Sequence, residues 1–308
     1  MTKHLLSVFD LNKAEIWSII KSAITLKKSG KSSKILAGYA LGMIFEKPST
    51  RTSVSFAVAM DQLGGMPLML DAKNLQRKRG ETIKDTAYTL SRYLDGMMIR
   101  AFKHSDVQEF AKWSSVPIIN GLTDKEHPCQ VFGDILTIVE KRKIKTPEGL
   151  KQISVAFVGD GNNMANSWCA AAGVLGFSLY LARPKGYGPD KEILKRSLEE
   201  AKKSGAKIEV LENAQIVAQN ADVLYTDVWT SMGEEDEAEE RRVIFKKYQI
   251  NANLLSLAKV NCLVMHCLPA IRGEEITSDV MDGKNSVIFD QAENRLHIQK
   301  AILKHYLK

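Results

Sequence analysis

The chain has 308 residues, a formal net charge of +7 and 44% hydrophobic residues. This length favours two domains, because a single core rarely grows beyond about 250–300 residues. No apolar stretch approaches the roughly 18 residues of a membrane span, and Asp10 and Asn12 interrupt any signal-peptide core. The lysines are dispersed, so a lysine-rich surface explains the charge better than nucleic-acid binding. A small anionic substrate is a second interpretation.

The four cysteines are Cys129, Cys169, Cys262 and Cys267. Their spacing does not match a zinc site, and their density is too low for a disulfide framework. We therefore expect a reduced, cytoplasmic compartment.

The first half of the chain alternates predicted helices and strands. Helical spacing of apolar residues predicts helices over 13–28, 54–63, 83–94 and 131–139. Short apolar runs predict strands over 41–45, 67–70, 97–99 and 116–119. Ser105 and Gln108 predict a capping box that starts a further helix. The polar link 141–149 then marks a change of domain.

The second half repeats the alternation. Strands are predicted over 153–158, 179–182, 208–211, 223–225, 263–265 and 287–289, and helices include 164–175 and a terminal one over 292–307. Strands that alternate with helices indicate βαβ units and a parallel sheet. We therefore expect an α/β protein with two domains, residues 1–140 and 141–291, each a parallel β-sheet flanked by helices.

The stretch from Pro48 to Thr52 lies between a predicted strand and a predicted helix. Ser49 is a good N-cap, and the free N–H groups of a helix start favour an anion. Arg51 adds a planar fork of donors suited to phosphate. An ordinary capped helix with a surface arginine is an equally good interpretation of this stretch alone.

Further polar residues follow the other strand ends of the first half. They are Gln76, Arg100 and the motif His127-Pro128-Cys129-Gln130. Ligands of open parallel sheets bind outside the carboxyl ends of the strands, so one site can gather these residues. His127 alone would be read as a loop histidine, but together with Gln130 it can donate hydrogen bonds to a carbonyl oxygen.

Three motifs follow strand ends in the second half. Gly159-x-Gly161 invites a dinucleotide interpretation, but Met164 replaces the third glycine and the next strand ends in Arg183 instead of an acidic residue. The segment 227–233 places Asp227 where it can bind an ammonium group or merely cap a turn. The segment 266–269 contains Cys267, which is either a buried inert thiol or a site residue.

Taken together, the motifs resemble the aspartate/ornithine carbamoyltransferase family over essentially the whole chain. The first half carries Ser49-Thr50-Arg51-Thr52 and His127-Pro128-Cys129-Gln130, and the second half carries D-x-W-x-S-M-G and His266-Cys267-Leu268-Pro269. The second pair is similar to the ornithine-specific branch. The resemblance implies transfer of a carbamoyl group from carbamoyl phosphate to L-ornithine, giving citrulline and phosphate. It implies a carbamoyl phosphate domain that includes the C-terminal helix 292–308, and an ornithine domain.

The resemblance also implies residue roles. Catalysis is assigned to Arg51, Thr52, Arg100, His127 and Cys267. Carbamoyl phosphate binding is assigned to Ser49, Thr50, Arg51, Thr52, Gln76, Arg100, His127, Gln130, Cys267, Leu268 and Arg295. Ornithine binding is assigned to Asn163, Asp227, Ser231 and Met232. Either Cys267 or the departing phosphate takes the proton of the attacking amine.

No metal or organic cofactor is expected, because carbamoyl phosphate is already activated. The family resemblance implies a homotrimer or a multiple of it, in which the loop around Gln76 completes the neighbour's site. Neither nucleic acid nor a membrane is expected as a partner. The chain departs from the usual family pattern at Ser53, Ala57, Lys78 and Ile271.

Three rival functions stay open on the sequence. Another carbamoyltransferase would use aspartate, putrescine or an acylated ornithine, but Asp227 and Cys267 argue against an aspartate site. A non-catalytic protein that kept the fold is a second rival. A nicotinamide-dependent oxidoreductase is the third, and the broken glycine pattern disfavours it.

Overall fold

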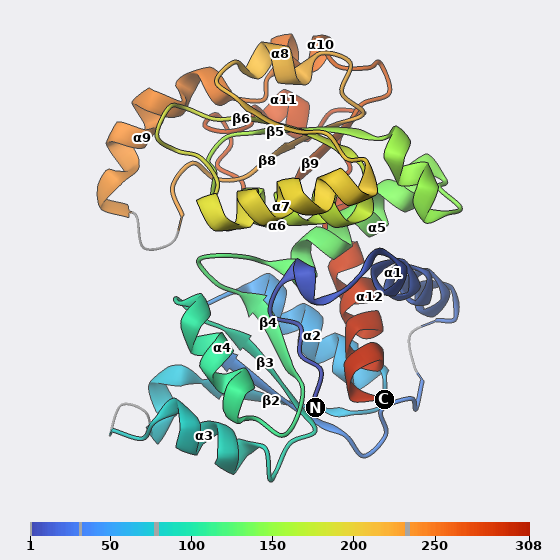
Figure 1. Ribbon diagram of the computed structural model, residues 1–308, viewed down its shortest axis with the longest axis vertical. Helices are drawn as coiled ribbons and strands as arrows, with labels where there is room; N and C mark the ends of the chain where they lie inside the picture. The colour runs from blue at the N-terminus through green and yellow to red at the C-terminus, as the bar shows by residue number, and fades with distance from the viewer. Residues whose placement is uncertain (1, 31–32, 77–79, 232–234) are drawn as a thin grey trace. The chain divides into compact units, whose positions relative to one another are not determined.

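The computed structural model of the protein describes residues 2–30, 33–76, 80–231 and 235–308. The chain divides into two compact units (Figure 1). The first unit consists of Met1–Leu136 with Glu293–Lys308, and the second consists of Thr137–Ala292. Each unit is described by itself below.

The first unit contains a parallel sheet in the order β2-β1-β3-β4. Its strands are β1 (Ala40–Phe45), β2 (Met66–Asp71), β3 (Gly96–Arg100) and β4 (Ile118–Leu122). Its helices are α1 (Lys13–Lys28), α2 (Thr50–Gln62), α3 (Ile83–Leu90), α4 (His104–Trp113) and parts of α5 (Pro128–Arg142) and α12 (Ile288–Leu307). Every residue of β1 and β3 is buried, as expected for strands covered on both faces.

Helix α12 joins the first unit although it lies at the far end of the sequence. Figure 1 draws it in red beside α1. Lys27 on α1 donates a 2.8 Å hydrogen bond to Asn294 on α12, and it pairs with Glu293 at 3.6 Å. The C-terminal helix thereby brings Arg295 into the first unit.

The second unit contains a parallel sheet in the order β7-β6-β5-β8-β9. Its strands are β5 (Ser154–Val158), β6 (Ser178–Ala182), β7 (Ile208–Leu211), β8 (Val223–Thr226) and β9 (Leu263–His266). Its helices are α6 (Asn163–Leu175), α7 (Lys191–Ser204), α8 (Ala214–Ala218), α9 (Ala238–Phe245), α10 (Ala252–Ser256) and α11 (Ser278–Met281). The two parallel sheets, each flanked by helices, confirm the predicted fold class.

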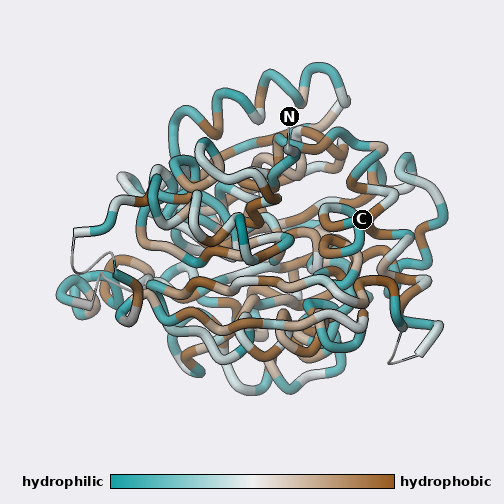
Figure 2. The backbone as a smooth tube through the Cα atoms, turned by 90° about the horizontal axis from the view of Figure 1, so that it is seen from below, coloured by the Kyte–Doolittle hydropathy of each residue, from teal (hydrophilic) through white to brown (hydrophobic). Residues whose placement is uncertain are grey.

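The helices bury one face, as their sequence periodicity requires. Figure 2 shows hydrophobic and hydrophilic residues alternating along the helical coils. In α7, for example, Ser197 and Ala201 are buried, while Lys195, Glu199 and Lys202 are exposed. None of the described helices is long and apolar enough to cross a membrane.

Two local predictions were wrong. The apolar run 287–289 is not a strand, because α12 begins at Ile288 and the preceding Ser286 forms an isolated bridge with Val264. A short apolar run does not distinguish a strand from a buried helix start. The helix predicted to start with a Ser105 capping box begins at His104, whose N–H donates to the Asp124 carboxylate at 2.7 Å. A carboxylate from a later loop replaces the local cap.

The order of strands creates one switch point in each sheet. In the first unit the strand order reverses between the parallel neighbours β1 and β3, where Phe45 is paired with Arg100. In the second unit the strand order reverses between β5 and β8, where Phe157 is paired with Tyr225. Open α/β sheets bind ligands at the carboxyl ends of the strands at such points. Both places carry predicted site residues.

Candidate active site

The start of α2 lies directly after β1, at the switch point of the first unit. The Ser49 hydroxyl caps the helix by accepting the Thr52 N–H at 3.2 Å. The same hydroxyl lies 3.0 Å from the Thr52 hydroxyl. Thr50 and Arg51 occupy the first turn, where Thr50 is exposed and Arg51 is partly exposed. The backbone N–H groups and the helix dipole make this turn suitable for an anion.

Arg295 completes this cluster from α12. Its Nη2 donates a buried 2.7 Å hydrogen bond to Thr52 Oγ1. Thr52 is 0% exposed and Arg295 is 4% exposed. Thr52 Oγ1 therefore accepts from Ser49 and Arg295, and its own hydrogen remains available for an acceptor.

Arg100 and His127 add polar groups from β3 and from the residue before α5. Both side chains are buried. Burial lowers the pKa of His127 well below its ordinary value, and the positive charges of Arg295 and Arg100 lower it further. His127 is therefore a neutral imidazole that can donate one hydrogen bond.

Gln130 lies on the first turns of α5 and is 1% exposed. Its Nε2 donates to Asp134 Oδ1 at 2.7 Å, and its Oε1 is buried without a hydrogen-bond partner in the part of the chain that the structure describes. Cys129 between His127 and Gln130 is a structural thiol, because burial raises its pKa to about 12.

Gln76 lies after the edge strand β2, and its side chain is exposed. Its backbone carbonyl accepts the Glu81 N–H at 3.3 Å. The structure gives Gln76 no place in the hydrogen-bonded cluster around Thr52. The departure Lys78 lies outside the described residues.

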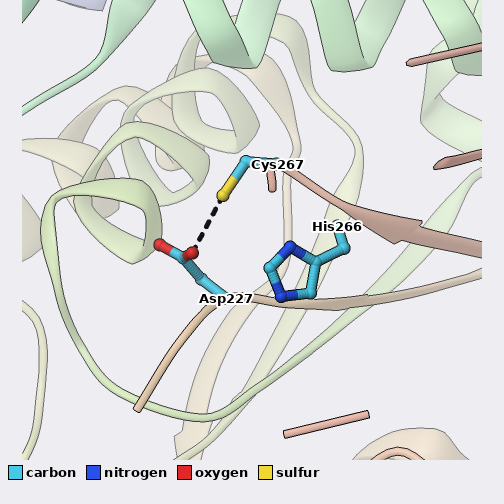
Figure 3. Close-up of side chains that lie close together, drawn as sticks. All are labelled: Asp227, His266 and Cys267. Atoms are coloured by element: carbon cyan, nitrogen blue, oxygen red, sulfur yellow. Dashed lines mark hydrogen bonds between the residues drawn. The ribbon is translucent and has the colours of Figure 1, made fainter. Parts of the chain in front are cut away.

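Asp227 is the centre of the candidate site in the second unit. It follows β8 and is 8% exposed. Its Oδ2 accepts from Asn162 Nδ2 at 2.8 Å. Its Oδ1 accepts from Cys267 Sγ at 2.9 Å (Figure 3) and from the Val228 N–H at 2.8 Å. Three donors therefore hold this carboxylate in one orientation.

Asn162 was not singled out from the sequence, which pointed to Asn163 instead. Asn162 is the N-cap of α6, and its Oδ1 accepts from Met164 N and Ala165 N. One side chain thus caps the helix and orients Asp227. Asn163 is the first residue of α6, and its carbonyl accepts the Ser167 hydroxyl at 2.8 Å. The favourable N-cap residue type of Asn162 was the available signal.

His266 supports the segment that carries Leu268. Its Nδ1 accepts the Leu268 N–H at 2.8 Å, and its Nε2 lies 3.0 Å from the Glu275 carboxylate, with both side chains 0% exposed. Because Nδ1 accepts, Nε2 carries the proton and donates to Glu275. This arrangement holds Leu268 in a left-handed conformation, with φ of 58°, which a branched residue adopts only when its surroundings enforce it.

The donor atoms of Asp227, His266 and Cys267 lie within 4.8 Å of one another, as a metal site would require (Figure 3). However, the two ring nitrogens of His266 are engaged by Leu268 and Glu275. Among these three residues only the Asp227 carboxylate and the Cys267 thiol keep ligand atoms for a metal. Two ligands are too few for the tetrahedral sites that zinc prefers.

Arg241 is a second residue that sequence reasoning missed, because it belongs to a charged run. It is 6% exposed and its Nη1 donates to Asp160 Oδ2 at 3.2 Å and to the Trp229 carbonyl at 2.9 Å. Its Nε donates to Glu237 at 3.0 Å. Arg241 therefore ties α9 to the loop that leads to Ser231. Met232 lies outside the described residues.

The glycine turn after β5 is filled by protein backbone. A Cβ atom on Gly161 would lie 2.1 Å from the carbonyl carbon of Gly188. Gly161 N also donates to the Tyr187 carbonyl at 3.0 Å. The absence of a side chain at Gly161 thus serves packing against residues 187–189.

Comparisons with known proteins cover both units. The model of the aspartate/ornithine carbamoyltransferase carbamoyl-P binding domain matches residues 3–140, and that of the Asp/Orn binding domain matches residues 151–306. The second match includes α12 residues that the structure places in the first unit.

Relatives match over almost the full length. An ornithine carbamoyltransferase of Methanosphaera stadtmanae is 53% identical over 306 residues, which is 99% of each chain. The anabolic ornithine carbamoyltransferase of Pyrococcus furiosus is 50% identical over 98% of this chain and 95% of that protein. A solved structure of the Pyrococcus furiosus enzyme has a TM-score of 0.93 at 50% identity, covering 98% of this chain and 96% of that one. An anabolic enzyme of Campylobacter jejuni has a TM-score of 0.93 at 41% identity, covering 99% of both chains.

Proposed function

The chain belongs to the aspartate/ornithine carbamoyltransferase family, and we propose that it transfers the carbamoyl group of carbamoyl phosphate to the side-chain amine of L-ornithine. The products are L-citrulline and phosphate. The relatives of about 50% identity that carry the name ornithine carbamoyltransferase support this choice within the family. We assign carbamoyl phosphate to the first unit and ornithine to the second.

The single observation that carries the choice of ornithine is the Asp227 carboxylate, held by Asn162 and Cys267. A fixed, buried carboxylate suits the α-ammonium group of an amino acid, because such a pair keeps both charges compensated. Asn163, Ser231 and Met232 are the proposed contacts of the rest of the amino-acid head. Cys267, whose thiol donates to Asp227, is the proposed neighbour of the reacting amine.

The phosphate of carbamoyl phosphate is assigned to the start of α2. Ser49, Thr50 and Arg51 would donate hydrogen bonds to it, together with backbone N–H groups. The Thr52 hydroxyl, which already accepts from Ser49 and Arg295, would donate its hydrogen to a substrate oxygen. Gln76 is proposed to bind the carbamoyl phosphate of a neighbouring subunit.

Donors for the carbamoyl oxygen are assigned to Arg100, His127 and Thr52. The neutral state of His127 supports this role, because its N–H donates without adding a second buried charge beside the two arginines. Donors of this kind stabilise the negative charge that develops on the oxygen in the transition state, by about 2.7–4 kcal/mol each. Gln130 Oε1 and the Leu268 carbonyl are the proposed acceptors for the carbamoyl amino group.

The reaction starts when the ornithine side-chain ammonium loses a proton, since its free pKa lies near 10 by analogy with lysine. The amine lone pair attacks the carbamoyl carbon, and a tetrahedral intermediate forms with the charge on the carbamoyl oxygen. The bond to the phosphate oxygen then breaks, and phosphate leaves with the bonding electrons. The thiol of Cys267 donates toward Asp227, so it is protonated in this arrangement, and the departing phosphate is the better candidate for the proton acceptor.

A homotrimer or a multiple of it is part of the proposal. The edge strand β2 leaves Met66 and Met69 more than half exposed, and Val54 on α2 is 55% exposed. An apolar strand edge of this kind favours coverage by another chain. A solution mass of three times the 34.3 kDa chain, or a multiple of that, is expected by light scattering. A cytoplasmic location and a role in arginine synthesis complete the proposal.

Citrulline formation tests the proposed reaction. The enzyme is incubated with carbamoyl phosphate and with ornithine, aspartate, putrescine or N-acetylornithine. Ornithine should be carbamoylated at least a hundredfold faster than the others, because a site built around buried polar groups rejects ligands that leave them unpaired. Turnover without ornithine specificity, or no turnover at all, would count against the proposal. The Arg51→Ala variant should lose most of this activity.

A further inference from the structure

We propose that Asp134 is a positioning residue that fixes the orientation of the Gln130 amide, so that its oxygen faces the amino group of carbamoyl phosphate. This inference rests on the proposed function and adds a residue to which neither the motifs nor the family resemblance gave a role. It concerns how the protein distinguishes the two similar ends of the carbamoyl group.

The geometry of the pair is simple. Gln130 and Asp134 lie one turn apart on α5, with Gln130 Nε2 2.7 Å from Asp134 Oδ1. Both side chains are shielded from water, at 1% and 0% exposure. An i, i+4 contact on one helix holds two side chains in a fixed relation, so this pair does not depend on a mobile loop.

The chemistry of the pair sets the orientation of the amide. An ionised carboxylate only accepts hydrogen bonds, whereas the glutamine amide has one end that donates and one that accepts. The NH2 end of Gln130 must therefore face Asp134, and the oxygen must point away. Among the described residues, Gln130 Oε1 is buried and has no partner. A buried acceptor of this kind is costly unless a ligand donates to it.

A fixed orientation of the Gln130 amide matters because the two ends of the carbamoyl group have opposite hydrogen-bonding character. Its carbon carries a carbonyl oxygen, which accepts, and an amino group of similar size, which donates. The proposed donors Arg100 and His127 suit the carbonyl oxygen, so the remaining end needs an acceptor. A Gln130 amide turned by 180° would place its own NH2 against the substrate NH2. Asp134 excludes that arrangement without touching the substrate.

The Asp134→Asn variant removes the constraint at almost constant volume. An asparagine side chain both donates and accepts, so it satisfies Gln130 in either orientation. The amide then populates both, and the apparent affinity for carbamoyl phosphate falls by the fraction that is turned and by the lost hydrogen bond. One neutral hydrogen bond corresponds to about a tenfold change in affinity.

Acetyl phosphate separates this effect from general damage. It carries a methyl group in place of the amino group and so gains nothing from the Gln130 oxygen. The KM for carbamoyl phosphate is measured in citrulline synthesis, and acetyl phosphate is titrated as a competitive inhibitor of the same reaction. The ratio of its inhibition constant to that KM measures the preference for the amino group. We expect this ratio to fall about tenfold in Asp134→Asn.

Two further variants complete the experiment. Gln130→Met removes the amide and should lower the ratio by a similar factor, after which Asp134→Asn should add little in the double variant. Asp222→Asn is the matched control. It changes a buried carboxylate of the second unit, which accepts from Ser154 N and Lys259, and it should lower stability without changing the ratio.

Unequal loss of the two ligands is the result that supports the inference. An unchanged ratio in a folded Asp134→Asn enzyme would overturn it. If that variant does not fold, an unchanged ratio in Gln130→Met would overturn it equally, because the amide oxygen would then not read the amino group. Absence of citrulline synthesis in the unmodified enzyme would instead refute the proposed function, which keeps the two failures distinct.

Discussion

Removal of the Thr52 hydroxyl should be the most informative single change in the candidate site. Thr52→Val replaces it by a methyl group of similar shape. The change deletes the oxygen that accepts from Ser49 at 3.0 Å and from Arg295 at 2.7 Å. It also deletes the one hydroxyl hydrogen that those two contacts leave available.

The two lost contacts differ in cost. Ser49 is partly exposed, so its hydroxyl can turn to water. Arg295 is 4% exposed, and its guanidinium loses an acceptor in a buried place. Hydrogen bonds to charged groups contribute about 1.5–3 kcal/mol, so we expect the free energy of unfolding to fall by about that amount. A domain stability of about 5–15 kcal/mol tolerates this loss.

The catalytic loss should exceed the loss of stability. One donor to the developing charge corresponds to about 10²–10³ in kcat. Urea unfolding and citrulline synthesis measure the two effects separately. Thr52→Ser keeps the hydroxyl and should retain most of the activity, while Ser197→Ala removes a buried hydroxyl in the second unit and should affect stability alone. If Thr52→Val kept a kcat/KM for carbamoyl phosphate within twofold of the unmodified enzyme, the role assigned to Thr52 would be refuted.

Three further predictions follow from the same contacts. Asp227→Asn should raise the KM for ornithine at least tenfold and leave that for carbamoyl phosphate unchanged; equal changes in both would contradict the assignment of ligands. Arg241→Met should also raise the KM for ornithine and lower stability by about 3–5 kcal/mol, since it leaves a buried carboxylate without its cation, whereas Arg242→Met breaks an exposed pair and should do neither. The pKa of His127 lies below its unfolded value of 6.5, so the unfolded chain binds more protons and stability falls as the pH drops below about 6.5; urea unfolding of His127→Gln should show a slope smaller by up to about 1.4 kcal/mol per pH unit.

Local sequence patterns were enough to predict the fold class of the protein. The alternation of apolar runs and helical periodicity predicted two parallel sheets, and the residue type of Ser49 predicted the cap that the structure contains. These features depend on neighbours within about four residues, which the sequence displays directly. The sequence also shows that Gln130 and Asp134 are four residues apart at the start of a predicted helix. Only the structure shows that both side chains are buried.

Contacts between distant segments could not be predicted in the same way. Which of two adjacent asparagines meets Asp227 depends on where α6 begins, and the structure assigns that contact to Asn162, 65 residues away. The ring of His266 was visible in a motif, but its tautomer depends on Glu275 and on the folded loop. Arg241 looked like one more charge in a polar run, because sequence alone does not reveal that its guanidinium is buried.

The packing of Gly161 against residues 187–189 limits which ligands this half of the fold can take. A glycine in such a turn ordinarily leaves space for a phosphate to approach the backbone. Here Gly188 and Pro189 occupy that space. A phosphate of a redox cofactor could approach this turn only if residues 187–189 moved away from Gly161. Substitution of side chains in the turn alone would therefore not create a site for a dinucleotide phosphate at Gly161.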